Sequence, residues 1–242
     1  MIKKNTPYWL KKNLITGKNA DPESGGILIV GSGVTGVSTA YWLYKYGFRD
    51  LKIVDFEPEK SASFRNCGHI LNGTVESMKA LKEIHGLKKA REIWQFSVDS
   101  CEDIKKTVTD LNLECQYRQD GYLVMAIDSQ EAQEIKESVE ILNSFGFDNV
   151  FLDEDDIKKK GFQNIKAGRF EKASAQIHPV MFRNSLLSYL LDKGVSYYSQ
   201  CQVKRIEEDS DKSTVTFESN KKNTYEAVVL EQMLIALLLI VV

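Results

Sequence analysis

The chain has 242 residues, of which 43% are hydrophobic and 27% are charged, so it can bury a sizeable core and is not a disordered protein. Lysine and arginine (32 residues) nearly balance aspartate and glutamate (34 residues), and the lysines at 158–160 follow the acidic run 153–156 after one residue. This alternation is typical of a solvated helix surface and excludes the sustained basic stripe of a nucleic-acid-binding protein.

Residues 1–24 are interpreted as an extension before the first domain. They contain lysines but no apolar stretch long enough for the core of a signal peptide. The four cysteines are scattered, with no Cys-x-x-Cys pair and no matching histidines, at Cys67, Cys101, Cys115 and Cys201. We therefore expect reduced thiols, a cytoplasmic location and no metal site.

Residues 26–55 have the pattern of a β-α-β unit. An apolar run at 27–30 breaks at a glycine-rich turn, and apolar residues with helical spacing follow from 34 to 46. Gly47 ends this predicted helix, and a second apolar run from 51 to 55 stops on an acidic residue. The order strand, helix, strand predicts two neighbouring parallel strands joined by a helix.

The turn of this unit carries the G-x-G-x-x-G fingerprint of dinucleotide-binding folds. Gly31 permits the tight turn, Gly33 lets the backbone approach a pyrophosphate, and Gly36 keeps the helix close to the sheet. The pyrophosphate is expected at the helix N-terminus, at Val34 and Thr35, where free N–H groups and the helix dipole favour an anion.

Further positions extend this fingerprint. Ala40 continues the face of the helix that packs on the sheet, and Asp55 stands where an acidic residue accepts hydrogen bonds from an adenosine ribose. A glycine-rich turn without a ligand is the alternative interpretation. With Gly47, however, six positions fit the pattern in register, so we predict a dinucleotide site.

The segment "EKSASFRNCGHILNGT", residues 59–74, contains the pattern Ala-Ser-x-x-Asn-x-Gly, matched by Ala62, Ser63, Asn66 and Gly68. Together with the glycine fingerprint, it resembles the D-amino acid oxidase family of FAD-dependent oxidoreductases, which includes glycine oxidase, sarcosine oxidase and gamma-glutamylputrescine oxidase. The resemblance implies FAD as the cofactor. A nicotinamide dehydrogenase is disfavoured because this segment would have no role in it.

The same resemblance implies where the chain contacts FAD. In the family, the segment after the second strand runs past the flavin, and the position of Val203 presents its backbone to the adenine. Without the resemblance, His69 would be an ordinary loop histidine, and Cys67 is interpreted as a packing residue rather than a covalent flavin anchor. The implied contacts beyond the fingerprint are Phe56, Ala62, Ser63, Cys67, Gly68, His69 and Val203. No catalytic residue is identified.

The resemblance extends from residue 7 to about residue 230 and implies two domains. Residues 25–85 and 179–230 are expected to form the FAD-binding domain, and residues 86–178 part of a substrate domain. Helical stripes interpreted as core faces lie at 78–87, 98–108 and 132–142, a strand pattern at 122–127, a helix from Pro179 to about 193, and strand patterns at 201–207, 213–219 and 224–230. His178 is interpreted as a structural residue at the domain crossover.

The last residues, 231–242, depart from the family pattern. Family members continue after the strand matching "YEAVVL" with a segment such as Ala-Thr-Asn-Ala-Tyr-Ser-Pro. Writing that peptide as codons and deleting one base gives Glu-Gln-Met-Leu-Ile-Ala-Leu, the sequence of residues 231–237. We therefore interpret this tail as the out-of-frame end of a longer flavoenzyme. Its ten final apolar residues are fewer than the ~20 of a membrane-spanning helix, and a buried terminal strand stays an alternative.

These patterns and the resemblance predict an α/β protein: a Rossmann-like FAD-binding domain with an inserted α+β substrate domain and a missing C-terminal part. By resemblance, the function is oxidation of the C–N bond of an amino acid or amine by hydride transfer to flavin. The alternative is a catalytically inactive, truncated fragment of such an enzyme. The expected partner is a small-molecule amine or amino acid, with no nucleic acid and no membrane span. The particular substrate and the oligomeric state stay open.

Overall fold

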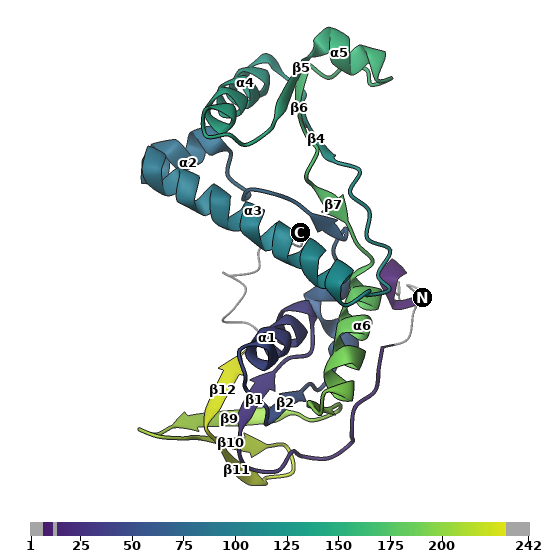
Figure 1. Cartoon of the computed structure of the whole chain (residues 1–242), viewed down its shortest axis with the longest axis vertical. Coiled ribbons are helices and arrows are strands. Elements are labelled where there is room, and N and C mark those ends of the chain that lie inside the picture. Colours follow the sequence, from purple (N-terminus) through teal and green to yellow (C-terminus); the bar gives the residue numbers. More distant parts are fainter. Residues whose placement is uncertain (1–6, 12–13, 231–242) are drawn as a thin grey trace, which may run out of the picture. The chain divides into compact units, whose positions relative to one another are not determined.

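Figure 1 shows the computed structural model, which describes residues 7–11 and 14–230. The chain forms two compact units. Within the described residues, unit 1 extends to Cys67 and takes up Leu113–Gln116 and the chain from His178 onward, while unit 2 comprises Gly68–Asn112 and Tyr117–Ile177. The tail interpreted above as out of frame, 231–242, lies outside the described residues.

The centre of unit 1 is a four-stranded sheet in which every neighbouring pair is parallel. In the order β12-β1-β2-β8, its strands are Ala227–Leu230, Ile27–Val30, Leu51–Val54 and Ser196–Tyr198. β1 and β2 are almost entirely buried, as expected for parallel strands covered on both faces, and β12 lies at one edge. This sheet confirms the predicted α/β class. The periodicity does not predict β8, which has only three residues.

Two helices and a second sheet complete unit 1 (Figure 1). α1 (Val34–Lys45) directly follows β1 and packs against α6 (Pro179–Asp192), which begins at the predicted proline. The second sheet is antiparallel in the order β11-β10-β9, with strands Lys222–Tyr225, Ser213–Phe217 and Val203–Glu208. Short 3-10 helices lie at Tyr8–Lys11, Pro58–Lys60 and Ala62–Phe64.

The predicted strand at 224–230 is in fact divided between the two sheets. Tyr225 ends β11 with its ring buried, and Ala227 opens β12 in register with Ile27 of β1. Between them, the N–H of Glu226 donates to the carbonyl of Gly26 at 2.8 Å. The chain therefore crosses from one sheet to the other at Glu226, where a continuous strand could not satisfy both pairings.

An apolar cluster joins the two sheets of unit 1. It contains buried residues from the parallel sheet, from the antiparallel sheet and from the connection between β8 and β9: Leu28, Val54, Tyr198, Cys201, Val215, Phe217 and Tyr225. Neighbouring residues in a strand point to opposite faces. Ile29, next to Leu28, accordingly points toward α1, where a Cβ on Gly36 would lie 3.5 Å from its Cγ2.

The chain before β1 is packed on unit 1 rather than set apart as a free extension. The N–H of Lys18 donates to the carbonyl of Tyr197 at 2.9 Å, and the N–H of Ser199 donates to the carbonyl of Lys18 at 3.1 Å. The N–H of Gly17 donates to the hydroxyl of Ser199 at 3.0 Å. These bonds fix residues 17 and 18 along the outer side of β8.

Unit 2 combines helices with an antiparallel sheet in the order β4-β6-β5, with strands Tyr122–Ala126, Ala167–Glu171 and Val150–Asp153. Its helices are α2 (Met78–His85), α3 (Leu87–Asp110), α4 (Ser129–Ser144) and α5 (Glu154–Lys159). β3 (His69–Ile70) and β7 (Ala175–Gln176) form a separate two-stranded ladder. Of the helices in residues 7–11 and 14–230, none has the length and apolar character needed to cross a membrane.

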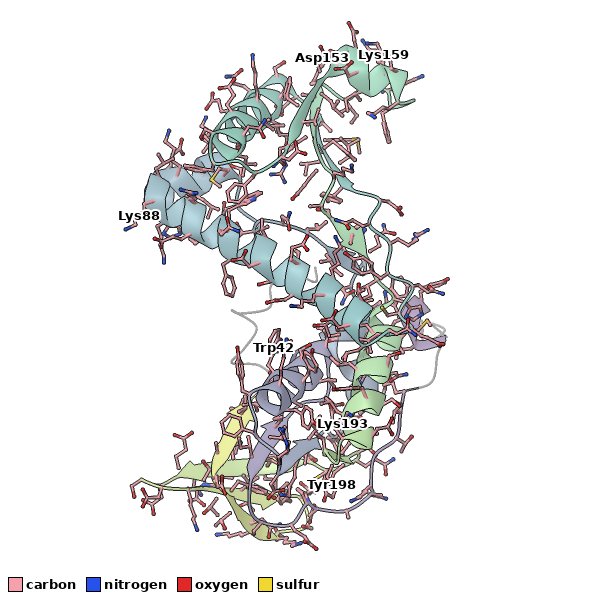
Figure 2. The ribbon with its side chains drawn as sticks, in the orientation of Figure 1. Trp42, Lys88, Asp153, Lys159, Lys193 and Tyr198 are labelled. Carbon is pink, nitrogen blue, oxygen red and sulfur yellow. The ribbon has the colours of Figure 1, made fainter. Side chains whose placement is uncertain are left out.

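The charged run at 153–160 forms the helix surface that the sequence predicts. Figure 2 labels Asp153 and Lys159 of this segment. The side chain of Asp153 accepts a hydrogen bond from the N–H of Asp156 at 2.9 Å and so caps α5. Lys158 pairs with Glu154 at 3.0 Å and Lys159 with Asp156 at 3.2 Å. Because these side chains are exposed, the pairs add little to stability.

Unit 2 begins earlier in the chain than the predicted substrate domain. Met78 and Leu81 of α2 pack with Trp94 of α3 and Leu142 of α4 in one buried cluster. Because α2 forms its core with α3 and α4, residues 68–85 belong to unit 2, and not to the FAD-binding domain in which the resemblance implies them.

The predicted apolar stripe of α2 is only partly a core face. Met78 and Leu81 are buried, but Ile84 is 62% exposed and Leu87 is 48% exposed. Gly86 separates the last two, because its φ of 77° ends α2 and redirects the chain into α3. The continuous helix that the spacing implies is therefore two helices.

Candidate dinucleotide-binding site

The predicted glycine fingerprint lies at the edge of the sheet where the parallel strands end. The N–H of Gly31 donates to the carbonyl of Val54 at 2.8 Å, so the turn crosses the ends of β1 and β2. Gly31 has a φ of 109°, which favours glycine. A Cβ on Gly36 would lie 2.1 Å from the carbonyl oxygen of Gly31, so only glycine lets α1 approach the turn this closely.

The N-terminus of α1 presents backbone donors at this edge. Its N-cap residue, Gly33, provides no side-chain cap. The N–H of Val34 donates to the hydroxyl of Ser63 at 3.0 Å. Within the part of the chain that the structure describes, the N–H groups of Thr35 and Gly36 have neither a partner inside the helix nor a side-chain cap. Adjacent free N–H groups at a helix N-terminus, together with the helix dipole, form a position for an anion.

The segment after β2 is held against this N-terminus. Besides accepting from Val34, Ser63 donates its own N–H to the hydroxyl of Ser61 at 3.2 Å and accepts from the side-chain amide of Asn66 at 2.8 Å. The fully buried Phe64 anchors the segment in unit 1. Ala62 and Ser63 therefore lie beside the start of α1, while Cys67, at the end of the segment, is exposed.

Gly68 and His69 belong to unit 2. The carbonyl of Gly68 accepts from the N–H of Ile177 at 2.8 Å, and His69 pairs with Gln176 in the β3–β7 ladder. The ring of His69 lies 5.6 Å from that of Tyr122. His69 is thus a strand residue rather than part of a loop.

Asp55, the predicted ribose ligand, is held by its own turn. Its Oδ2 accepts from the N–H of Ser32 at 2.7 Å and from the Ser32 hydroxyl at 2.9 Å, while Oδ1 accepts from the N–H of Glu57 at 3.1 Å. A carboxylate has about four acceptor positions. Described residues occupy three of them, which leaves one position on Oδ1 for a ligand.

Phe56 and Val203 lie near the same strand end. Phe56 follows Asp55 and is 45% exposed. The N–H of Cys201 donates to the carbonyl of Asp55 at 2.9 Å, which brings the chain leading into β9 beside the end of β2. Val203, the first residue of β9, packs against the apolar cluster between the two sheets.

Arg183 is a residue of this site that the sequence reasoning missed. It lies on α6 and is 0% exposed. Its Nε donates to the carbonyl of Ser32 at 2.9 Å, Nη2 donates to the Ser32 hydroxyl at 2.8 Å, and Nη1 donates to Oδ1 of Asn184 at 3.0 Å. Its guanidinium is 5.1 Å from the centre of the Tyr197 ring. The available signal was an arginine in register with the apolar residues Leu186, Leu187 and Leu190, the buried face of a helix.

His178 has the structural role that we predict for it. It is the N-cap of α6, and its Nδ1 accepts from the N–H of Met181 at 3.3 Å. Its ring packs edge-on against Trp9 with centroids 4.8 Å apart. The side chain is 6% exposed, so it anchors the start of α6 in unit 1.

Unit 2 contains a separate cavity of about 410 Å³. Asn72, Trp94, Asn149 and Glu171 are among the residues that line it. Glu171 is 3% exposed and accepts a hydrogen bond from the side-chain amide of Asn72. Burial raises the pKa of the Glu171 carboxyl, against the opposing effects of the Arg169 charge and the Asn72 bond. Within the described ranges, no group of three or more His, Cys, Asp or Glu side chains is placed to hold a metal ion.

The comparisons with known proteins identify a family and several similar proteins. The family model described as FAD dependent oxidoreductase matches residues 26–230. The chain is 24% identical over 184 residues to a probable oxidoreductase of Haemophilus influenzae, covering 75% of this chain and 42% of that protein. It is 25% identical over 156 residues to gamma-glutamylputrescine oxidoreductase of Escherichia coli, covering 64% of this chain and 36% of that protein.

Among solved structures, the fold is similar to that of glycine oxidase from Bacillus cereus. The TM-score is 0.69 at 18% identity, and the match covers 87% of this chain and 57% of that chain. The 242 residues therefore span less than two thirds of each of these three proteins.

Proposed function

The chain belongs to the D-amino acid oxidase family of FAD-dependent oxidoreductases, and from this we propose that unit 1 binds the ADP half of FAD at the ends of its parallel strands. One observation carries the proposal. The glycine turn, the N-terminus of α1 with the N–H groups of Thr35 and Gly36, and the carboxylate of Asp55 meet at the ends of β1 and β2. Ligands of open α/β sheets bind at this edge.

The residues at this edge fit a dinucleotide. The close approach of Gly36 to Gly31 leaves backbone, not side chains, at the start of α1. In our proposal the N–H groups of Thr35 and Gly36 bind the pyrophosphate, and the remaining acceptor position of Asp55 takes one ribose hydroxyl. The neighbourhood of Phe56 and Val203 receives the adenine.

For the whole protein, we propose oxidation of the C–N bond of an amino acid or amine. FAD, when bound, supplies the hydride acceptor, and the protein supplies orientation and electrostatics. The names of the relatives, gamma-glutamylputrescine oxidoreductase and glycine oxidase, support this substrate class. The remaining contacts implied by resemblance, at Ala62, Ser63, Cys67, Gly68 and His69, are part of the same proposal.

We also propose that this protein acts in the cytoplasm. The four cysteines, all within the described residues, form no disulfide, and three of them are buried. Cysteines without disulfides are typical of a reducing compartment.

A second candidate is a chain that binds FAD without oxidising an amine. The observations that carry the proposal concern FAD binding, and the chain spans 42% of one relative and 36% of another. Binding and turnover therefore have to be measured separately.

The pyrophosphate position is tested by titrating the 242-residue protein with FAD and following flavin fluorescence. We expect Thr35→Asp to weaken FAD binding at least about tenfold, because it places a negative charge where the pyrophosphate lies. The same charge is favourable at a helix N-terminus, so the melting temperature should be unchanged or higher. Thr35→Asn is the matched control, with the same size and no charge, and should bind within about threefold of the original chain.

Equal FAD affinities of the Asp and Asn variants would place the pyrophosphate elsewhere. Adding an amine or amino acid to the FAD complex without oxygen then separates the two candidates. Bleaching of the flavin absorption supports C–N oxidation, and an unchanged spectrum across a panel of such substrates supports binding alone.

A further inference from the structure

The hydrogen bonds around the Ser32 hydroxyl have one consistent direction. This hydroxyl has one proton and two lone pairs. Because an ionised carboxylate only accepts, the proton goes to Asp55 at 2.9 Å. Because a guanidinium only donates, Arg183 occupies one lone pair at 2.8 Å. The hydroxyl of Tyr197, 3.2 Å away, therefore donates to the other lone pair. Ser32 thus connects a buried cation to a carboxylate, with every position of its hydroxyl in use.

Hydrogen bonds, and not packing alone, hold the side chain of Arg183 in place. Its Nε and Nη2 converge on the carbonyl and hydroxyl of a single residue, Ser32, in the planar fork that distinguishes arginine from lysine. Its third contact, to Asn184, is reinforced because the same Oδ1 accepts from the N–H of Ile15 at 3.3 Å. A guanidinium that is 0% exposed needs such compensation for its lost hydration.

The charge of Arg183 matters because of Asp55. The carboxylate of Asp55 is bonded to the N–H of Ser32 at 2.7 Å, so a negative charge lies at the glycine turn itself. An anion binding to Thr35 and Gly36 would be repelled by that charge. Arg183 contacts the same residue, Ser32, and supplies the opposite charge from within the protein, where screening by salt is weak.

We propose that Arg183 is a positioning residue for the FAD pyrophosphate. It fixes the turn through Ser32, so that the N–H groups of Thr35 and Gly36 point to the anion, and its charge offsets that of Asp55. This inference rests on the FAD site proposed above. It adds a specific requirement: Arg183 should raise the affinity for ligands that carry phosphate and leave the affinity for other ligands unchanged.

The test compares ADP with adenosine, because the two share the adenine and ribose and differ in the diphosphate. Both are titrated by nuclear magnetic resonance into the original chain, Arg183→Met and Arg183→Lys. For Arg183→Met we expect ADP binding to weaken at least about tenfold, with adenosine binding changed less than about threefold. Arg183→Lys keeps the charge without the fork and should recover part of the ADP affinity.

Arg169→Met is the matched control. Arg169 lies in unit 2 with its guanidinium 5.1 Å from the ring centre of Trp94, so the same substitution beside an aromatic ring should leave the ratio of ADP to adenosine affinity unchanged. Failure of the original chain to bind ADP or FAD would refute the proposed function itself. If the original chain binds ADP and Arg183→Met binds it equally well, the site stands and the role of Arg183 is refuted.

A merely structural role predicts a different result, equal weakening of ADP and adenosine. Should Arg183→Met not fold, Arg183→Lys decides the question. A ratio of ADP to adenosine affinity below that of the original chain supports the inference, and an unchanged ratio overturns it.

Discussion

Replacing Ser32 by alanine tests the buried connection between Arg183 and Asp55. The substitution removes one oxygen and with it three hydrogen bonds, to Arg183, Tyr197 and Asp55. Two backbone contacts survive, from the N–H of Ser32 to Asp55 and from Nε of Arg183 to the carbonyl of Ser32. The perturbation is therefore confined to the hydroxyl.

The expected loss follows from the groups left behind. Nη2 of the fully buried Arg183 and the hydroxyl of Tyr197, which is 2% exposed, lose their acceptor. An unsatisfied buried donor costs about 1–3 kcal/mol, and more when it is charged. Since the backbone contacts persist and neighbouring groups relax, we expect a total loss of about 2–4 kcal/mol in the free energy of unfolding of unit 1.

The assay is hydrogen exchange read by mass spectrometry in low urea, because it reports on the two units separately. Peptides covering β1 and β2 should exchange faster by the factor that corresponds to 2–4 kcal/mol, roughly 30- to 900-fold. Peptides covering β4 and β6 should be unaffected, since they belong to unit 2. Ser38→Ala, at a buried serine of α1, is the matched control and should change exchange little. A loss below about 0.5 kcal/mol for Ser32→Ala would refute the argument that this hydroxyl completes a buried network.

Two further predictions concern titratable groups. Burial raises the pKa of Glu171 above its unfolded value of 4.5, so its contribution to stability is complete below that pH and is lost as the pH rises through the folded pKa. Exchange of the β6 amides in unit 2 should therefore accelerate as stability falls over that range, after correction for the intrinsic pH dependence of exchange. Glu171→Gln should abolish this acceleration. A Gln variant with the same pH dependence would show that another group is responsible. For the cysteines, burial raises the pKa of the Cys101 and Cys201 thiols to about 12, whereas Cys67 is exposed. Because the thiolate is the reactive form, iodoacetamide at pH 8 should alkylate Cys67 well before either of them, and peptide mass spectra with the opposite order would contradict the burial of these thiols.

The sequence predicts the first β-α-β unit closely because its signals are local. Gly31, Gly36 and the apolar runs of β1 and β2 act within about thirty residues, where spacing decides geometry. Pro179 likewise marks the start of α6 by a local backbone constraint.

The rest of the site depends on contacts between residues far apart in the chain. Nothing in the spacing shows that Arg183 reaches Ser32, 151 positions away, or that the Ser32 hydroxyl occupies an acceptor position of the Asp55 carboxylate. The split of 224–230 at Glu226 and the assignment of α2 to unit 2 also follow from packing partners that periodicity does not identify. The ribose contact of Asp55 stays a prediction, now limited to a single acceptor position.

The place of β12 at the edge of the parallel sheet has a practical consequence. Its one neighbour within the described residues is β1, so the row of N–H and C=O groups on the other side of Ala227–Leu230 has no strand to pair with there (Figure 1). An open apolar edge of this kind is a template on which another chain can add a strand. Protein concentration thus becomes a variable in every experiment above, and dilution series are the means of separating ligand binding from self-association.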